Sequence, residues 1–390
     1  MKRYFDPAID IATLRTEAVG PVEDMARFNA TAARERILSR ERFSEQAIRK
    51  IAIYPYDFRW GYHTNVRPIW NEPRPELVAR VFEGNGFVVT RLRSRRQDEG
   101  VPLVWTTSLA GHHLLDPNSC PLPIFAARAR ANLSTPARAW LASLGLPDPD
   151  ANRDTAALPW MHALAVGYAP AWLAENEAGI RQDWPRVPLP GSAALLRASA
   201  ALGARVAALL DPDTPVPGVT AGDIGPALRA IAVPAKRGGG PMGEDDRAVT
   251  AGWGRAGKES AVMPGRGRIT SCDYAAGEEA TAARAALLGP RTNDIFLNAD
   301  AFWRNVPDAV WGFTIGGYQV LKKWLSYRER PLLGRALTPG EVRYARDVAR
   351  RLAALRLMSP ELDANYRACA AAHVPLDPLP PAPSREGRGS

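Results

Sequence analysis

Two basic clusters are the parts of this 390-residue sequence whose residue types and spacing could do chemistry. The first lies between two predicted strands, 87–93 and 101–108, which the charged turn 94–100 joins as a hairpin. Arginine pairs bidentately with a phosphate or with a guanine edge, so the cluster indicates nucleic-acid contact. A solvated hairpin tip explains the same charges, and the residues alone leave both interpretations open. Its members are Arg91, Arg93, Arg95 and Arg96.

The second cluster surrounds a pair of glycines. Apolar residues alternate over 310–315 and predict a strand, Gly316 and Gly317 break this period, and 318–328 has the period of a helix. A glycine turn before a helix leaves backbone N–H groups free for an anion such as a phosphate. The alternative is an ordinary strand–helix corner with solvated lysines. The predicted phosphate contacts are Lys322, Lys323 and Arg328, and Gln319 is a weaker candidate for a base contact.

Several helices and strands must position these clusters. Residues 51–54 predict a strand, and a helix with a clear apolar stripe begins at Ser192 and stops at Asp211-Pro212. Residues 134–154 have the composition of a connector, and 278–288 predict one short helix closed by Gly-Pro.

The strongest helix signal is Thr338-Pro339-Gly340-Glu341, a capping box with proline in the first turn. Four arginines lie largely outside the apolar stripe of this helix and predict a basic flank that could follow a phosphate backbone. They are Arg343, Arg346, Arg350 and Arg351.

The motifs of several enzyme classes are absent from the sequence. There is no Asn/Asp-Pro-Pro-Tyr/Phe run of the kind that aminomethyltransferases use, no Gly-x-Ser-x-Gly elbow, and no helicase box. The triple glycine after Arg237 lacks the Gly-Lys-Ser/Thr of a P-loop and predicts a flexible segment. His112, His113 and Cys120 make no set of converging ligands, because neighbours on a strand point to opposite faces. We therefore predict neither a catalytic residue nor a metal site.

Composition points to a folded protein with a polyanionic partner. The hydrophobic content is 46%, the formal net charge is +9 and the pI is about 9.7. No uninterrupted apolar run is long enough to span a bilayer, and residues 1–6 lack the apolar core of a signal peptide. The expected location is the cytoplasm, without a membrane partner. Three scattered cysteines suggest neither a disulfide framework nor a zinc ribbon.

Three stretches carry a resemblance to a known family. The run 294–328, with Asn298 and Trp303-Arg304-Asn305-Val306-Pro307, is similar to the C-terminal specificity region of type ISP restriction–modification enzymes. Residues 55–62 resemble that family's Tyr-x-Pro-Phe-Asp-x-Arg signature, with Tyr56 where Phe is usual. The stretch 183–190 resembles a Pro-Arg-Val/Ile-Pro-Leu-Pro run of the same enzymes.

The family consists of single-chain helicase–nuclease–adenine methyltransferases whose last region recognises the DNA target. The resemblance implies an α+β module that binds double-stranded DNA and presents a target adenine to a methyltransferase on another chain or a missing N-terminal domain. S-adenosylmethionine would bind that partner, and this chain would hold no cofactor. The alternatives are a split methyltransferase subunit that is active only with its partner, or an inactive truncated remnant. Whether the chain counts as an enzyme stays open, and the resemblance assigns no role to the basic residues above.

The expected organisation has two recognition subdomains of mixed strands and packed helices. A helical lead-in covers 1–50, a strand-rich subdomain covers 51–150, and a helical and α+β subdomain covers 151–373 with a Pro/Gly-rich loop at 211–247. The expected disordered tail is 374–390.

Overall fold

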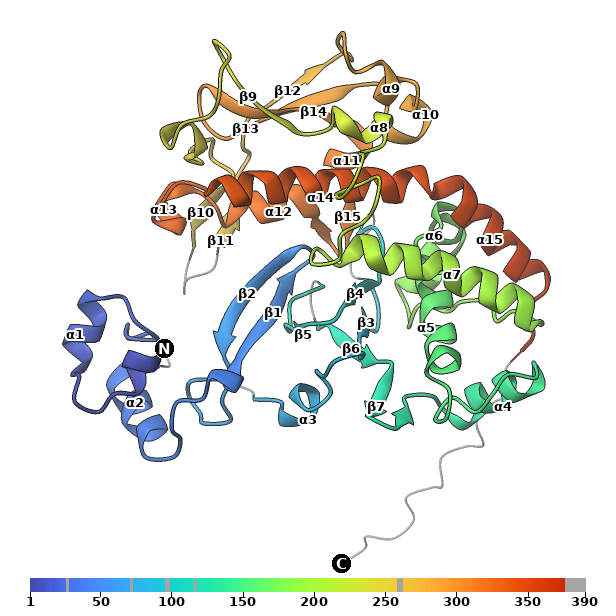
Figure 1. The fold of residues 1–390 in the computed structure, drawn as a ribbon, viewed down its shortest axis with the longest axis horizontal. Helices are drawn as coiled ribbons and strands as arrows, with labels where there is room; N and C mark the ends of the chain where they lie inside the picture. Colours follow the sequence, from blue (N-terminus) through green and yellow to red (C-terminus); the bar gives the residue numbers. More distant parts are fainter. Residues whose placement is uncertain (26–27, 71–72, 95–98, 116–117, 258–261, 376–390) are drawn as a thin grey trace, which may run out of the picture.

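The computed structural model describes residues 1–25, 28–70, 73–94, 99–115, 118–257 and 262–375. They form an α+β fold in which several small sheets are grouped around long helices, as predicted (Figure 1). One hydrophobic core extends from Ile51 to Tyr366 and includes residues of both predicted subdomains. The boundaries of those subdomains stay a prediction.

A small N-terminal lobe stands beside the main body (Figure 1). It holds α1 (Ile11–Thr16) and α2 (Ala30–Leu38), whose N-caps are the side chains of Asp10 and Asn29. The lobe has its own apolar core, in which Tyr4 and Phe5 pack near Tyr62 of the first hairpin.

That hairpin consists of β1 (Ile48–Tyr54) and β2 (Asp57–Tyr62). β1 also pairs in parallel with β5 (Leu109–Ala110), so β2 is an edge strand. In the next sheet β3 (Phe87–Thr90) lies between β4 (Val104–Thr106) and β6 (Cys120–Pro123). The antiparallel pairing of β3 with β4 confirms the predicted hairpin, although both strands are shorter than expected. The remaining elements of this half are α3 (Pro75–Val78), β7 (Phe125–Ala127) and β8 (Arg130–Ala131).

Four helices form the side of the molecule next to these sheets: α4 (Thr135–Ser143), α5 (Arg153–Gly167), α6 (Pro170–Ile180) and α7 (Ala193–Leu210). α7 begins after Ser192, as predicted, and the hydroxyl of Ser192 accepts a hydrogen bond from the Leu195 N–H. α4 was predicted as a connector, and this is wrong, because Ser134 caps a helix whose Trp140 is buried. Among the described helices, α7 has the length and apolar composition of a membrane span, but half of it is buried inside the protein, as in a core helix.

The C-terminal half is built on a four-stranded antiparallel sheet of order β12-β13-β14-β9. Its strands are β9 (Val233–Lys236), β12 (Ile269–Cys272), β13 (Thr292–Phe296) and β14 (Ala301–Pro307). A separate two-stranded hairpin consists of β10 (Gly254–Ala256) and β11 (Val262–Pro264). Short helices lie around the sheet: α8 (Pro226–Arg229), α9 (Glu279–Ala282) and α10 (Ala285–Leu288), the last two replacing the single helix predicted for 278–288.

The long helix α14 (Pro339–Leu357) lies between this sheet and the β1–β2 hairpin, and α15 (Ser359–Ala371) follows it (Figure 1). The predicted capping box of Thr338 and Glu341 is confirmed. The predicted basic flank is partly wrong, because Arg350 and Arg351 are buried. Arg351 donates to the carbonyl oxygens of Ala208 and Thr214, so its guanidinium binds groups inside the protein and does not face the surface.

The strand predicted for 310–315 is also wrong over most of its length. Residues Asp308–Trp311 form the short helix α11, and only β15 (Thr314–Ile315) is extended, paired with β16 (Tyr318–Gln319). Gly316 and Gly317 make the tight turn at φ values of 53° and 87°, which favour glycine. The predicted helix then follows as α12 (Val320–Ser326), before α13 (Arg330–Leu333).

Candidate nucleic-acid interface

Lys323 of α12 lies in a cage of three tyrosines. Its ammonium nitrogen is 4.2 Å from the ring centroid of Tyr54, 5.0 Å from that of Tyr318 and 4.9 Å from that of Tyr327. The Tyr54 and Tyr327 hydroxyls are hydrogen-bonded at 2.7 Å. Burial, reinforced by that hydrogen bond, raises the pKa of Tyr54, so this phenol stays neutral. The faces of aromatic rings attract cations, and the cage therefore fixes the lysine in one place.

Arg59 of the edge strand β2 extends this arrangement. Its guanidinium carbon lies 4.9 Å from the same Tyr327 ring, and its side chain is 48% exposed. The neighbouring Trp60 is 72% exposed, the largest value among the exposed large apolar side chains that the structure describes. Because neighbours on a strand point to opposite faces, the Trp60 ring lies on the other face of β2 from Arg59.

The described residues of the β10–β11 hairpin carry one further cation, Arg255, beside α12. The base of the hairpin approaches α12 so closely that a Cβ built on Gly254 would lie 2.0 Å from the Ser326 carbonyl oxygen. The buried carboxylate of Glu329 accepts a hydrogen bond from the Trp253 N–H. Burial raises the pKa of Glu329, and the N–H groups of Trp253 and Gly252 oppose that rise. The hairpin is thereby fixed to the helix, and Arg255 projects from it as an exposed side chain.

The indole N–H of Trp253 donates to the carbonyl oxygen of Phe296 in β13, which links the hairpin to the four-stranded sheet. Two guanidinium groups lie near the Phe296 ring, that of Arg268 at 4.3 Å and that of Arg237 at 5.8 Å from its centroid. Both arginines are exposed.

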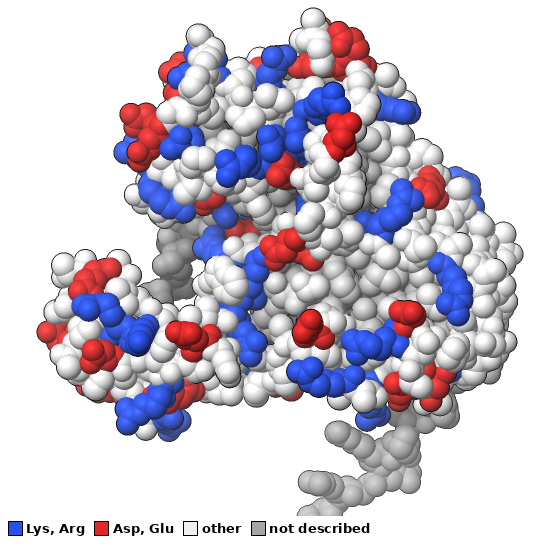
Figure 2. Space-filling model, viewed as in Figure 1, with Lys and Arg blue, Asp and Glu red and all other residues white. Residues whose placement is uncertain are grey.

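These contacts connect five cations, which we call the basic strip: Arg59, Lys323, Arg255, Arg268 and Arg237. Figure 2 shows Lys and Arg side chains spread over the sheet-bearing part of the molecule and along the hollow between this part and the N-terminal lobe. The acidic groups that hold the strip together, Asp57 and Glu329, are buried, and each is already bonded to protein partners. Cations held in place by aromatic rings suit a surface that contacts the phosphates of a nucleic acid.

Arg328, a predicted phosphate contact, instead forms an ion pair inside the protein. Its two terminal nitrogens donate to the carboxylate oxygens of Asp57 at 2.9 and 2.8 Å, and only 12% of the side chain is exposed. Asp57 belongs to the signature-like run 55–62, so that run joins β2 to the end of α12.

Arg91 is a second correction. It is 2% exposed and forms a buried ion pair with Glu99, and it also donates to the Ser94 hydroxyl at 3.1 Å. A phosphate on the surface is therefore out of its reach. Arg93 is exposed and stays a candidate, whereas Arg95 and Arg96 lie outside the described residues.

The predicted anion site at the glycine pair is wrong as well. The Gly316 N–H donates to Val101 and the Gly317 N–H to Glu99, both to backbone carbonyl oxygens at 2.8 Å. These donors are therefore used within the protein. The Gln319 amide donates to the Trp311 carbonyl at 2.7 Å, which weakens its candidacy as a base contact. Lys322 is half-buried on α12 and stays a candidate.

Of the five cations in the strip, sequence reasoning predicted only Lys323, because the members come from separate segments. The signal it could have used is the run of glycines and arginines at 252–268, which has the composition of a tight, basic hairpin. Within the described residues no group of three or more His, Cys, Asp or Glu side chains could hold a metal ion. His112 and His113 are exposed, with their rings edge to face at 4.9 Å.

Residues 13–349 match the family model of the type ISP C-terminal specificity domain. No curated protein matches the chain. Two solved structures share its fold at a TM-score of 0.50: a DrdV–DNA complex at 15% identity and the ATP-dependent type ISP restriction–modification enzyme LlaBIII bound to DNA at 11%. They cover 93% and 94% of this chain. A nuclease-deletion mutant of the type ISP enzyme LlaGI, in complex with a DNA substrate mimic, matches at 12% identity over 94% of the chain with a TM-score of 0.49. The chain spans only 32%, 21% and 30% of these three proteins, in that order.

Proposed function

The chain belongs to the family of type ISP C-terminal specificity domains, and we propose that it recognises a sequence in double-stranded DNA through the basic strip. Cations of the strip would fix the register of the duplex by contacts to phosphates, while a few arginine or amide side chains would bind base edges. The DNA-bound state of the DrdV and LlaBIII structures supports this proposal.

The observation that carries the proposal is the arrangement of the strip. Each of its cations except Arg255 lies against an aromatic ring, and its two supporting carboxylates are buried. Such a surface, on a chain with a net charge of +9, attracts a polyanion.

In this function the duplex would be held so that a target adenine reaches a methyltransferase on another chain or on a further domain. That partner would bind S-adenosylmethionine. The length of the enzymes that share the fold supports a partner of this kind, because this chain spans at most 32% of them.

The experiment is a titration of labelled duplexes with the full chain, starting from a pool of random sequences that is selected by binding. Lys323→Gln and Arg268→Gln are each expected to weaken binding of the selected duplex about tenfold, because each removes a charge-assisted contact. Arg197→Gln is the matched control, because it neutralises an exposed arginine on α7, away from the strip. Unchanged affinity in both strip variants, or no enriched sequence in the pool, contradicts the proposal.

A split methyltransferase subunit is the second candidate function, and the same size difference favours it. Mixing the chain with a methyltransferase-bearing partner should then give adenine methylation that neither protein supports alone. A chain that binds its duplex but leaves methylation by the mixture unchanged is a free-standing reader.

A further inference from the structure

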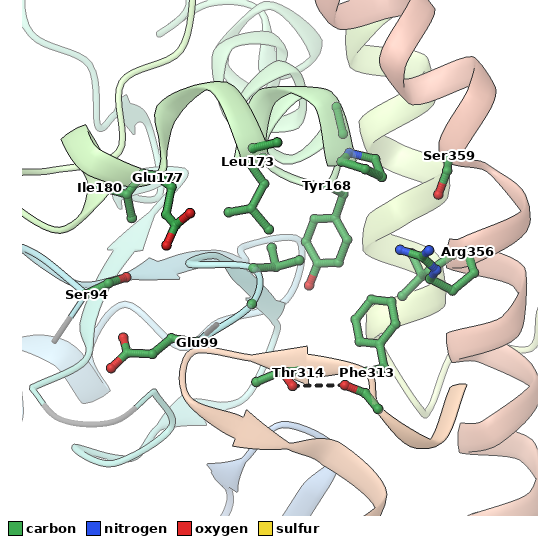
Figure 3. Close-up of a pocket in the computed structure, with 18 of the residues that line it drawn as sticks. Ser94, Glu99, Tyr168, Leu173, Glu177, Ile180, Phe313, Thr314, Arg356 and Ser359 are labelled. Atoms are coloured by element: carbon green, nitrogen blue, oxygen red, sulfur yellow. Dashed lines mark hydrogen bonds between the residues drawn. The ribbon is translucent and has the colours of Figure 1, made fainter. Parts of the chain in front are cut away.

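A cavity of about 540 Å³ lies where the two halves of the molecule meet, away from the basic strip. Its walls come from Ser94 and residues 99–101 after β3, the junction of α5 with α6, residues of 309–314 between α11 and β15, and the joint between α14 and α15 (Figure 3). The volume falls within the range of small-molecule sites, which is about 300–1,000 Å³.

The middle of the cavity is apolar. Tyr168, Leu173 and Phe313 line it, and Figure 3 shows their side chains pointing toward a common space. The Tyr168 hydroxyl donates to the Leu103 carbonyl at 3.0 Å, so this ring offers the cavity an apolar face. A flat or branched apolar group would fit against these walls.

One end of the cavity is cationic. Arg356 extends from α14 toward Tyr168 and Phe313 (Figure 3). Its Nε donates to the Leu287 carbonyl at 3.4 Å, and its two terminal nitrogens form no hydrogen bond with a described residue. Burial lowers the pKa of Arg356, and Asp363 offsets part of that effect. A half-buried guanidinium with open terminal nitrogens favours an anionic partner.

The acidic groups lie at the opposite end (Figure 3). Glu99 forms its ion pair with Arg91, which leaves Glu177 as the exposed carboxylate at the rim. The cavity therefore has Arg356 at one end, Glu177 at the other with the exposed Arg181 nearby, and an apolar space between them. We propose that it binds a small organic anion whose carboxylate or phosphate pairs with Arg356 and whose apolar body lies between Tyr168, Leu173 and Phe313. This site is separate from DNA recognition and does not depend on it.

The test is calorimetric titration of the full chain with three probes of equal body: naphthoate, naphthyl phosphate and the neutral naphthylmethanol. At least one anion should bind at a single saturable site about tenfold more tightly than the alcohol, because a charge-assisted bond to arginine is added. The two anions distinguish a carboxylate site from a phosphate site.

Arg356→Gln should abolish the preference for the anion and leave binding of the alcohol unchanged. Leu173→Trp should weaken all three probes by filling the apolar space, while Arg197→Gln, an exposed arginine of α7, should change none. Melting curves show that each variant is folded. Equal binding of anion and alcohol, retention of the preference in Arg356→Gln, or no binding of any probe overturns the proposal.

Discussion

The side chain of Asp57 joins two parts of the chain that are far apart in sequence. It is fully buried, lies at the start of β2 and holds the guanidinium of Arg328 by two hydrogen bonds. In sequence both residues look like polar groups of a surface. Their pairing shows why charge alone is a poor guide to DNA contacts, since a buried arginine balances a buried carboxylate.

We predict that Asp57→Asn destabilises the protein by about 3 kcal/mol, because it leaves the Arg328 charge buried without a counter-ion. Chemical denaturation measures this loss. Arg59→Gln, which neutralises an exposed neighbour, should change the free energy of unfolding by no more than about 0.5 kcal/mol. Equal stability of both variants would refute a structural role for the pair.

His162 gives a prediction about pH. It is buried in α5, its Nε2 donates to the Pro188 carbonyl and its Nδ1 accepts from the Ser199 hydroxyl, both at 2.8 Å, and burial lowers its pKa to about 4. The unfolded chain, with a histidine pKa of about 6.5, takes up the proton first as the pH falls. Stability is therefore complete above about pH 6.5 and is lost toward pH 4, by about 3 kcal/mol in all.

The measurement is the free energy of unfolding against pH for the protein and for His162→Gln. The variant should lose the slope in this window, apart from the part that carboxylates contribute to both proteins. His373→Gln is the control, because this histidine is exposed and should leave the slope unchanged. A slope shared by all three proteins would assign the pH dependence to other groups.

At the level of elements, the sequence predicted those helix ends that depend only on residues nearby in the chain. The capping box of α14 and the Ser192 cap of α7 are satisfied within one turn of their own helix, so the sequence alone locates them. The burial of Arg91 depends on its ion pair with Glu99. The backbone of Glu99 is in turn held by the Gly316-Gly317 turn, which lies more than 200 residues later in the sequence. The strip likewise depends on the contact of the β10–β11 hairpin with α12, which no periodicity encodes. Charge clusters were thus correctly noticed, but their exposure could not be predicted.

The contact between hairpin and helix predicts opposite effects for two glycine substitutions. Gly254→Ala places a methyl group 2.0 Å from the Ser326 carbonyl oxygen and should cost about 1–3 kcal/mol, because the backbone must move. Gly179→Ala lies in α6 with nothing within 4 Å and should stabilise the protein by roughly 0.5–1 kcal/mol. Thermal melting of both variants gives the sign of each change in stability.

Only Gly254→Ala should also weaken duplex binding, because it displaces Arg255 and the strip beside it. If both substitutions stabilise the protein, the close approach of the hairpin to α12 is wrong.

On the scale of the whole molecule, the question is whether DNA affinity comes from the basic strip or from the net charge of +9. Both sources predict affinity that falls with salt, because each phosphate contact releases condensed counterions. The two sources differ in which cations, when neutralised by mutation, reduce DNA affinity. A local interface loses roughly 0.9 from the slope of log affinity against log salt for each contact removed.

We therefore compare two triple variants of equal charge change. One carries Arg59→Gln, Lys323→Gln and Arg268→Gln, and the other carries Arg197→Gln, Arg205→Gln and Arg367→Gln, exposed positions of α7 and α15. Duplex binding of the strip variant should show a salt slope reduced by up to roughly 2.7 and a large loss of affinity at fixed salt. The other variant should keep both values close to those of the unchanged protein. Because both variants have the same net charge, an equal reduction in the two would place the attraction in the overall field, and the strip would then have no special part in DNA binding.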